Sequence, residues 1–228
     1  KRDIILAPTA AEEGGDNNGV EYLIREHKPL IEAEYAINEG GGGALAGKGN
    51  DVKPLMNTIQ AAEKVPENFT LTVRNPGGHS SVPMPDNAIY SLSSGLMRLS
   101  RFSFPATLNP VTRSLFEQMA TMERPEFGAA MKAIVANPLD SAAATLLSTD
   151  PRYASLLRTT CVATKLSAGH ANNALPQTAT ANVNCRILPT SSTDETLATL
   201  NRVLADTSIK ITFTTAEREK FPTSTDPV

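Results

Sequence analysis

The sequence lacks several features that would point to particular classes of protein. It contains only two cysteines, Cys161 and Cys185, which are far apart and form no Cys-x-x-Cys pattern. Neither a disulfide framework nor a cysteine-built zinc site is therefore expected, and we expect two buried, inert thiols instead. No apolar run approaches the roughly 20 residues of a membrane-spanning helix, so the sequence predicts no membrane association.

Positive charge is not in excess either. The formal net charge is -3 at pH 7, and the sequence pI is about 5.7. A chain of this charge has no overall positive electrostatic potential that would attract phosphates, so we expect no nucleic-acid binding. Any acidic ligand would have to be bound by individual basic or polar side chains.

What is present is typical of globular domains. Hydrophobic residues make up 40% and charged residues 20% of 228 residues, enough for one large domain or two small ones. Residues 4–9 are predicted to form a buried strand, residues 18–30 a helix, and residues 34–38 a second short strand. Such a β-α-β unit belongs to a mainly parallel α/β sheet, in which active-site residues lie at the carboxyl ends of the strands.

Three carboxylates stand at these predicted strand ends. Glu12 and Glu13 follow the first strand beside glycines, and Glu39 follows the second. In a two-metal hydrolase, one carboxylate of an adjacent pair can bind a metal while the other accepts a proton from the metal-bound water. The alternative for each is a solvated acidic turn, because exposed carboxylates in loops are common. We place a domain boundary near residue 52.

A second module is predicted after the boundary. Alternation over 58–63 and again over 69–74 predicts a hairpin. The remaining order resembles a four-stranded antiparallel sheet with two helices on one face, the ferredoxin-like layout of an α+β fold, interrupted by a helical insert. The further expected elements are a helix over 86–101, the insert over about 103–157, strands over 159–167 and 178–188, a helix over 194–205 and a strand over 209–214.

Three polar residues of this module could serve a site. His79 follows two glycines in a loop, from which an imidazole N–H could be offered to a developing oxyanion; the alternative is a loop histidine capped by serines. Asn173 lies between two predicted strands. Arg186 lies within a strand, where its guanidinium could fork onto a carboxylate or simply occupy an exposed position.

The order of the motifs resembles one family. Glu-Glu-Gly-Gly, Asn-Glu-Gly-Gly, Gly-Gly-His-Ser-Ser, Asn-Ala-Leu-Pro and an arginine in Val-x-x-Arg-x-x-Pro are similar to motifs of the zinc peptidases that include aminoacylase, carboxypeptidase S, glutamate carboxypeptidase and succinyl-diaminopimelate desuccinylase. The resemblance spans nearly the whole chain. It implies zinc-dependent hydrolysis of an amide bond in a peptide or N-acyl amino acid with a free carboxylate.

The resemblance also implies a role for each residue. Glu12 would be the general base, and Glu13 and Glu39 would each bind one of two zinc ions. His79 would reach from the lid into the active site of the partner in a homodimer, while Asn173 and Arg186 would hold the carboxylate end of the substrate.

The departures from the family indicate an incomplete enzyme. The His-x-Asp motif and the last histidine ligand are absent, and the only histidines are His27, His79 and His170. We therefore expect part of the catalytic domain over 1–52, the lid over 53–217 and a hinge over 218–228, with zinc held poorly and little activity. The rival hypothesis is a non-catalytic dimerisation module.

Overall fold

The computed structural model describes residues 3–11, 17–37, 42–48 and 51–213, and it divides the chain into two units, Lys1–Ile59 and Gln60–Val228. Each unit is described by itself. The boundary near residue 52 stays a prediction. Among the helices formed by the described residues, none has the length and apolar character needed to cross a membrane.

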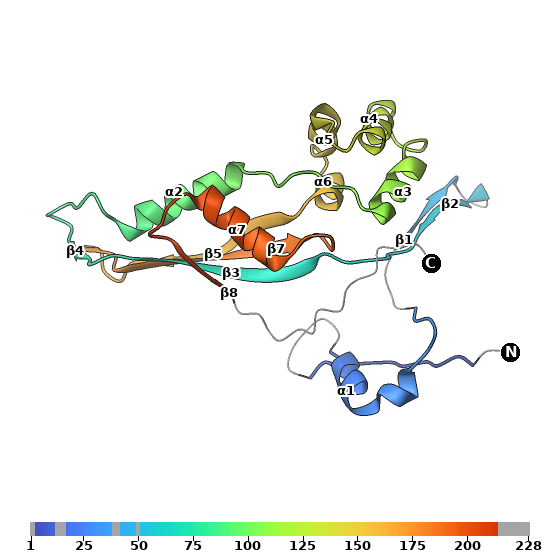
Figure 1. Cartoon of the computed structure of the whole chain (residues 1–228), viewed down its shortest axis with the longest axis horizontal. Coiled ribbons are helices and arrows are strands. Elements are labelled where there is room, and N and C mark those ends of the chain that lie inside the picture. The colour runs from blue at the N-terminus through green and yellow to red at the C-terminus, as the bar shows by residue number, and fades with distance from the viewer. Residues whose placement is uncertain (1–2, 12–16, 38–41, 49–50, 214–228) are drawn as a thin grey trace. The chain divides into compact units, whose positions relative to one another are not determined.

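The described residues of the first unit form one helix and a two-stranded hairpin (Figure 1). Helix α1 spans Gly19–Ile31, and it begins where the Asn18 side chain accepts hydrogen bonds of 2.9 and 3.1 Å from two backbone N–H groups of the first turn. Strands β1 (Gly42–Ala46) and β2 (Lys53–Thr58) pair antiparallel. The predicted helix over 18–30 is confirmed.

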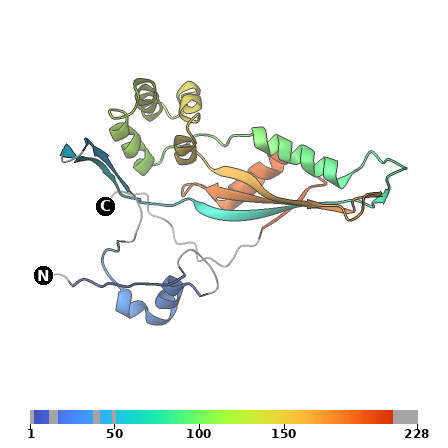
Figure 2. The ribbon, with the colours of Figure 1, turned by 180° about the vertical axis from the view of Figure 1, so that it is seen from behind.

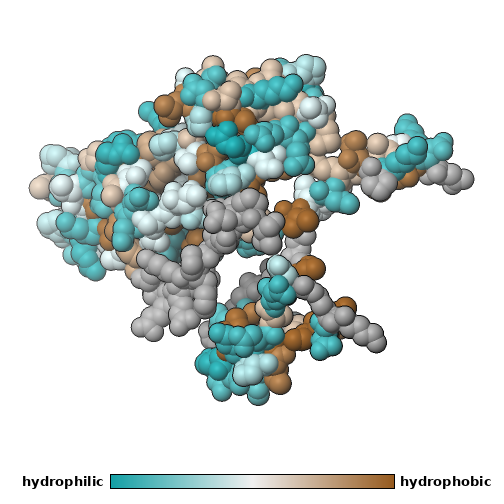
Figure 3. All heavy atoms as spheres, turned by 45° about the vertical axis from the view of Figure 1, so that its right-hand side comes forward, coloured by the Kyte–Doolittle hydropathy of each residue, from teal (hydrophilic) through white to brown (hydrophobic). Residues whose placement is uncertain are grey.

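The predicted β-α-β unit is wrong for the described residues. Residues 4–9 and 34–37 form no strand. The hairpin expected between 58–63 and 69–74 is also wrong, because β2 pairs with β1 and not with a strand over 69–74. A strand needs a hydrogen-bonding neighbour, and burial of apolar side chains is what makes an extended ladder favourable. No described residue of this unit is buried, and some of its apolar side chains are visible as brown atoms in Figure 3.

The second unit contains an antiparallel sheet with the strand order β5-β7-β3-β8. Read from β8, its four strands are the fourth, first, third and second along the chain, which is the ferredoxin-like order. The predicted α+β fold with a helical insert is confirmed. The elements are β3 (Val65–Arg74), β4 (Gly78–His79), α2 (Ala88–Arg101), α3 (Pro110–Met119), α4 (Pro125–Ala136), α5 (Ser141–Leu147), α6 (Pro151–Leu157), β5 (Thr160–Ala168), β6 (Ala174–Leu175), β7 (Thr178–Ile187), α7 (Thr193–Leu204) and β8 (Lys210–Phe213).

Among the described residues of the second unit, helices cover one face of the main sheet and leave the other face open. Helices α2 and α7 lie on the same face in Figures 1 and 2, and both bury leucines against the sheet. Burying one such side chain stabilises the fold by about 1.5–3 kcal/mol. Alternate residues of β7 face this core, and the residues between them face the open side. The core includes Phe69, Leu71, Leu92, Leu99, Val183, Ile187, Leu200 and Leu204.

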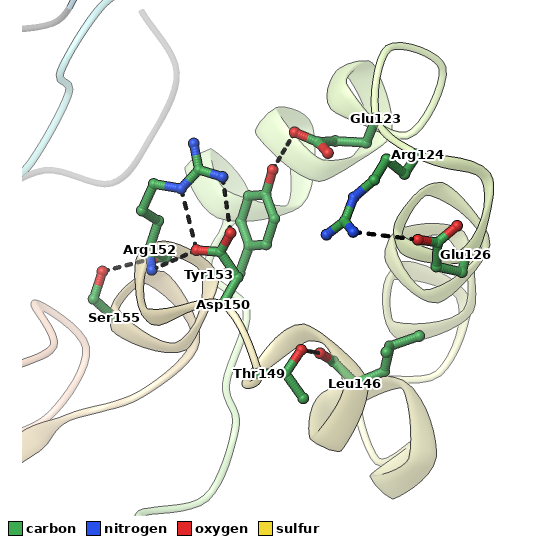
Figure 4. A network of polar contacts seen from close by, with 9 residues as sticks. All are labelled: Glu123, Arg124, Glu126, Leu146, Thr149, Asp150, Arg152, Tyr153 and Ser155. Carbon is green, nitrogen blue, oxygen red and sulfur yellow. Dashed lines mark hydrogen bonds and ion pairs between the residues drawn. The ribbon is translucent and has the colours of Figure 1, made fainter.

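The helical insert has a hydrophobic core of its own. Figure 4 shows polar contacts of the insert: the Tyr153 hydroxyl donates to the Glu123 carboxylate, and Arg152 pairs with Asp150 at 2.8 Å. Burial, together with the bond to Glu123, raises the pKa of Tyr153 to about 12, so the phenol remains a donor. The core residues of the insert include Phe116, Met131, Ile134, Leu147, Tyr153 and Leu157.

The two cysteines form a disulfide, so the prediction of two free thiols is wrong. Cys161 on β5 lies directly opposite Cys185 on β7, and their sulfur atoms are 2.00 Å apart. A separation of 24 residues in the sequence gives no sign of this contact, because the register of the strands decides which side chains meet.

Candidate functional site

A short two-stranded ladder at one end of the main sheet carries His79 (Figure 1). Strand β4 pairs with β6, which places His79 opposite Ala174. The backbone N–H of Ser80 donates to the carbonyl of Asn173 at 2.9 Å. The structure therefore brings two predicted site residues, His79 and Asn173, side by side although they are far apart in the sequence.

The turn before His79 is held by Asn75 and a glycine. The Asn75 side chain accepts from the N–H of Gly77 and donates to the carbonyl of Asp86, each at 2.9 Å. Gly77 has a φ of +81°, and a Cβ at this position would lie 2.7 Å from Cγ of Gln177. Glycine meets both demands without strain, so the local sequence fixes the position of the turn.

The imidazole of His79 is exposed and engaged on one side only. Its Nδ1 accepts a hydrogen bond from the backbone N–H of Ser81 at 3.2 Å, and the Ser81 hydroxyl lies 2.8 Å from the same nitrogen. Because Nδ1 acts as an acceptor, we assign the proton of the neutral ring to Nε2. Within the described residues Nε2 has no hydrogen-bond partner, which leaves this N–H able to donate to a ligand.

Arg186 lies toward the other end of the main sheet. It is on β7, opposite Pro66 of β3 and Thr160 of β5, and its exposed side chain makes no hydrogen bond or ion pair with the part of the chain that the structure describes. At roughly 3.3 Å per residue, β7 covers roughly 26 Å between Thr178, beside the short ladder, and Arg186. One chain therefore does not bring Arg186 and His79 together.

The three predicted carboxylates, Glu12, Glu13 and Glu39, lie outside the described residues. Within the ranges that are described, no group of three or more His, Cys, Asp or Glu side chains could hold a metal ion. Carboxylate oxygens suit zinc, but a zinc site needs about four donors. Glu13 and Glu39 cannot complete two such sites, so the other donors would have to come from outside this set, and zinc stays a prediction.

A charged residue near Arg186 was not predicted from the sequence. Lys64 stands directly before β3 and is half-buried, and its Nζ donates to Oγ1 of Thr160 at 3.0 Å. Burial and, second, the positive charge of Arg186 lower the pKa of Lys64 to about 8. No residue pattern marks this lysine, because its neighbours are set by the pairing of β7 with both β3 and β5.

Residues 67–212 match the family model of the peptidase dimerisation domain, M20_dimer. The chain is 29% identical over 216 residues to probable carboxypeptidase S-like 2 of Dictyostelium discoideum, covering 92% of this chain and 40% of that protein. It is 26% identical over 207 residues to N-fatty-acyl-amino acid synthase/hydrolase PM20D1 of Xenopus tropicalis, covering 88% of this chain and 39% of that protein. The chain thus spans about 40% of the length of these curated relatives.

Solved structures align over part of the chain. An M20 family metallo-carboxypeptidase from Sulfolobus solfataricus aligns with 63% of this chain and 40% of its own length, at 16% identity and a TM-score of 0.40. The family model covers more than half of the 228 residues, from near the start of the sheet's first strand to its last strand. The chain therefore belongs to the M20 peptidases, a family of hydrolases, and carries their dimerisation domain.

Proposed function

We propose that this chain forms the lid and dimerisation part of a zinc-dependent hydrolase that cleaves the amide bond of peptides or N-acyl amino acids with a free carboxylate. The names of the relatives support this substrate class, since one is described as carboxypeptidase S-like and another as an N-fatty-acyl-amino acid synthase/hydrolase. The geometry of His79 and Arg186 supports it from the side of the chain itself.

His79 is suited to stabilise an oxyanion. When water attacks an amide carbonyl, negative charge develops on the carbonyl oxygen, and a donor 2.7–3.1 Å away stabilises that charge. The Nε2–H of His79 has no partner among the described residues, and Ser81 fixes the opposite side of the ring. The backbone of Asn173 is hydrogen-bonded to the segment after His79, and its side-chain amide is the proposed further polar contact for the substrate.

Arg186 is suited to hold the carboxylate. Its guanidinium has no acidic partner among the described residues, so a carboxylate ligand does not have to displace an internal ion pair. A guanidinium binds a carboxylate through two parallel hydrogen bonds, which fixes the orientation of the substrate as well as its position.

The separation of these two residues carries the proposal. The strand between the two ends of the sheet is roughly 26 Å long, whereas an extended dipeptide spans only about 7 Å. A small substrate held by Arg186 of one subunit therefore cannot reach His79 of the same subunit. We infer that His79 of the partner subunit completes the site, which requires a homodimer.

Strand β5 is the sheet edge that we propose pairs with a second copy. It runs over nine residues, Thr160–Ala168, whereas the opposite edge, β8, has four. Most of β5 is exposed, and an unpaired edge of this length is a ready pairing surface. Antiparallel pairing about a two-fold axis places Ala168 of the partner subunit beside Thr160. The His79 end of the partner then lies at the same end of the joined sheet as Arg186.

The carboxylates complete the proposal. Glu12 is the proposed general base, and Glu13 and Glu39 are the proposed zinc ligands. Zinc, when bound, supplies a water of lowered pKa as nucleophile. Other donors from the complete enzyme are needed, because two carboxylates do not satisfy the coordination of two ions.

Mixed dimers of the full-length enzyme test the shared site. A subunit with His79→Ala and a subunit with Arg186→Ala are co-expressed with different affinity tags, and the heterodimer is purified through both. One of its two sites then has both side chains and the other has neither, so activity should return to about half of wild type, although each parent homodimer is nearly inactive. A heterodimer of His170→Ala with wild type is the matched control. Activity no higher than that of the parents contradicts the proposal.

A further inference from the structure

Lys64 joins three parts of the second unit. Its Nζ donates to the carbonyl oxygen of Ser155 at 3.1 Å, to that of Arg158 at 2.8 Å and to Oγ1 of Thr160 at 3.0 Å. The two carbonyls belong to the end of helix α6 and the segment after it, and Thr160 opens β5. All three protons of the ammonium group are used, so Lys64 holds the helical insert against the beginning of the sheet.

One of these contacts lies next to Arg186. Thr160, which accepts from Lys64, lies directly opposite Arg186 in the pairing of β5 with β7. The positive charge of Arg186 also acts on Lys64, where it adds to burial in lowering the pKa of the lysine. Two cations therefore lie near each other at this end of the open sheet face.

No acid compensates the two charges within the described residues. Neither Lys64 nor Arg186 takes part in a described ion pair. The acids nearest to Lys64 in the sequence are engaged elsewhere: Glu63 accepts from Gln60 at 2.5 Å, and Glu67 accepts from the backbone N–H of Asn68 at 3.2 Å. Like charges repel, and an anion between or beside them offsets this repulsion. A bound carboxylate would relieve this repulsion.

We propose that Lys64 is a positioning residue for Arg186: it fixes Thr160, which lies opposite Arg186 on the neighbouring strand, and adds a positive charge at neutral pH, so that this corner prefers ligands with a free carboxylate. The inference rests on the proposed function, in which Arg186 meets the substrate. Lys64 itself does not touch the substrate, because its three donors are already satisfied within the fold.

A purely structural role would have a different signature. If Lys64 only anchored the insert, its loss would lower stability and reduce turnover of every substrate alike. A positioning role changes the preference between two substrates that differ only in the carboxylate. The discriminating quantity is therefore the ratio of kcat/KM for an N-acyl amino acid to kcat/KM for its carboxamide.

The test uses Lys64→Met and Lys64→Arg in the full-length enzyme, with Lys210→Met as the control for loss of an exposed lysine on the opposite edge strand of the sheet. Lys64→Met should lower the ratio about five- to tenfold, mainly through KM of the carboxylate substrate, because one nearby unit charge is removed. Lys64→Arg should largely rescue the ratio, since the charge is kept, and Lys210→Met should leave it unchanged. An unchanged ratio in Lys64→Met overturns the proposal.

A milder variant covers the case in which Lys64→Met fails to fold. Thr160→Val removes the acceptor and keeps the shape of the side chain, and it should lower the ratio about two- to threefold. An unchanged ratio in Thr160→Val overturns the proposal in that case. Failure of the proposed function is separate. It is shown by a wild-type enzyme whose kcat/KM does not depend on the carboxylate, or by an Arg186→Met variant that keeps the wild-type ratio.

Discussion

Replacing Gly77 by alanine tests how the turn before His79 is built. A positive φ costs a residue with a Cβ about 1–2 kcal/mol, and φ of Gly77 is +81°. The added Cβ would also lie 2.7 Å from Cγ of Gln177. Gln177 would have to move and give up its 3.2 Å hydrogen bond to the carbonyl of Pro76, a loss of about 0.5–1.5 kcal/mol. The free energy of unfolding should fall by about 1.5–3.5 kcal/mol in all.

Gly169 provides a matched control for this substitution. Its φ is +77°, nearly the same, but a Cβ there would have no other atom within 4 Å. Gly169→Ala should therefore cost only the backbone part, about 1–2 kcal/mol. The gain from a less flexible unfolded chain is common to both substitutions and cancels in their difference.

Urea unfolding followed by circular dichroism measures both variants in the chain of 228 residues. Gly77→Ala should cost about 1 kcal/mol less in the Gln177→Ala background than in the wild-type chain, because the crowded side chain is gone. In the full-length enzyme, Gly77→Ala should also lower turnover more than Gly169→Ala does, since the His79 ring is displaced. Equal stability losses at Gly77 and Gly169 would refute the close contact between the turn and Gln177.

Three further predictions concern the carboxylates, pH and the disulfide. In the full-length enzyme, Glu12→Gln should lower turnover by roughly 10²–10⁴ at unchanged metal content, whereas Glu13→Gln should lose metal; wild-type turnover in Glu12→Gln would contradict the assignment. Hydrogen bonds from Arg152 lower the pKa of Asp150 to about 2 from 3.8, so its contribution to stability is complete above about pH 4 and is lost as the pH falls through about 2. Thermal unfolding of Asp150→Asn should lack this part of the acid dependence, and an unchanged pH profile would count against it. Reducing the Cys161–Cys185 disulfide, which closes a separation of 24 residues, should lower the free energy of unfolding by about 3 kcal/mol in urea, and identical curves with and without reductant would exclude this.

The elements that the sequence predicted well carry their own periodicity. The helix at Ala88–Arg101 has apolar residues at helical spacing, and the strand at Thr178–Ile187 alternates between buried and less buried positions. These patterns arise from packing on one core, so they can be recognised before the partner element is known. The ferredoxin-like order followed from the sequence of such elements along the chain.

The errors and omissions all depend on which strands become neighbours. The strand expected over 4–9 does not form, because apolar character alone does not supply a pairing partner. The contacts between Cys161 and Cys185, between His79 and Asn173, and between Lys64 and Thr160 are each set by strand register or by the path of the chain. Side chains far apart in the sequence meet there, and no local pattern records the meeting.

The mass of the chain in solution tests the central claim that the site is completed by a second copy through β5. Light scattering should report twice 24.3 kDa for the wild-type chain. Leu166 on β5 is 62% exposed, and Leu166→Lys should yield a monomer because a charge on an edge strand opposes pairing. Leu139→Lys in the insert, where Leu139 is 88% exposed, should leave the dimer intact. A wild-type mass of 24.3 kDa at every concentration would contradict the claim.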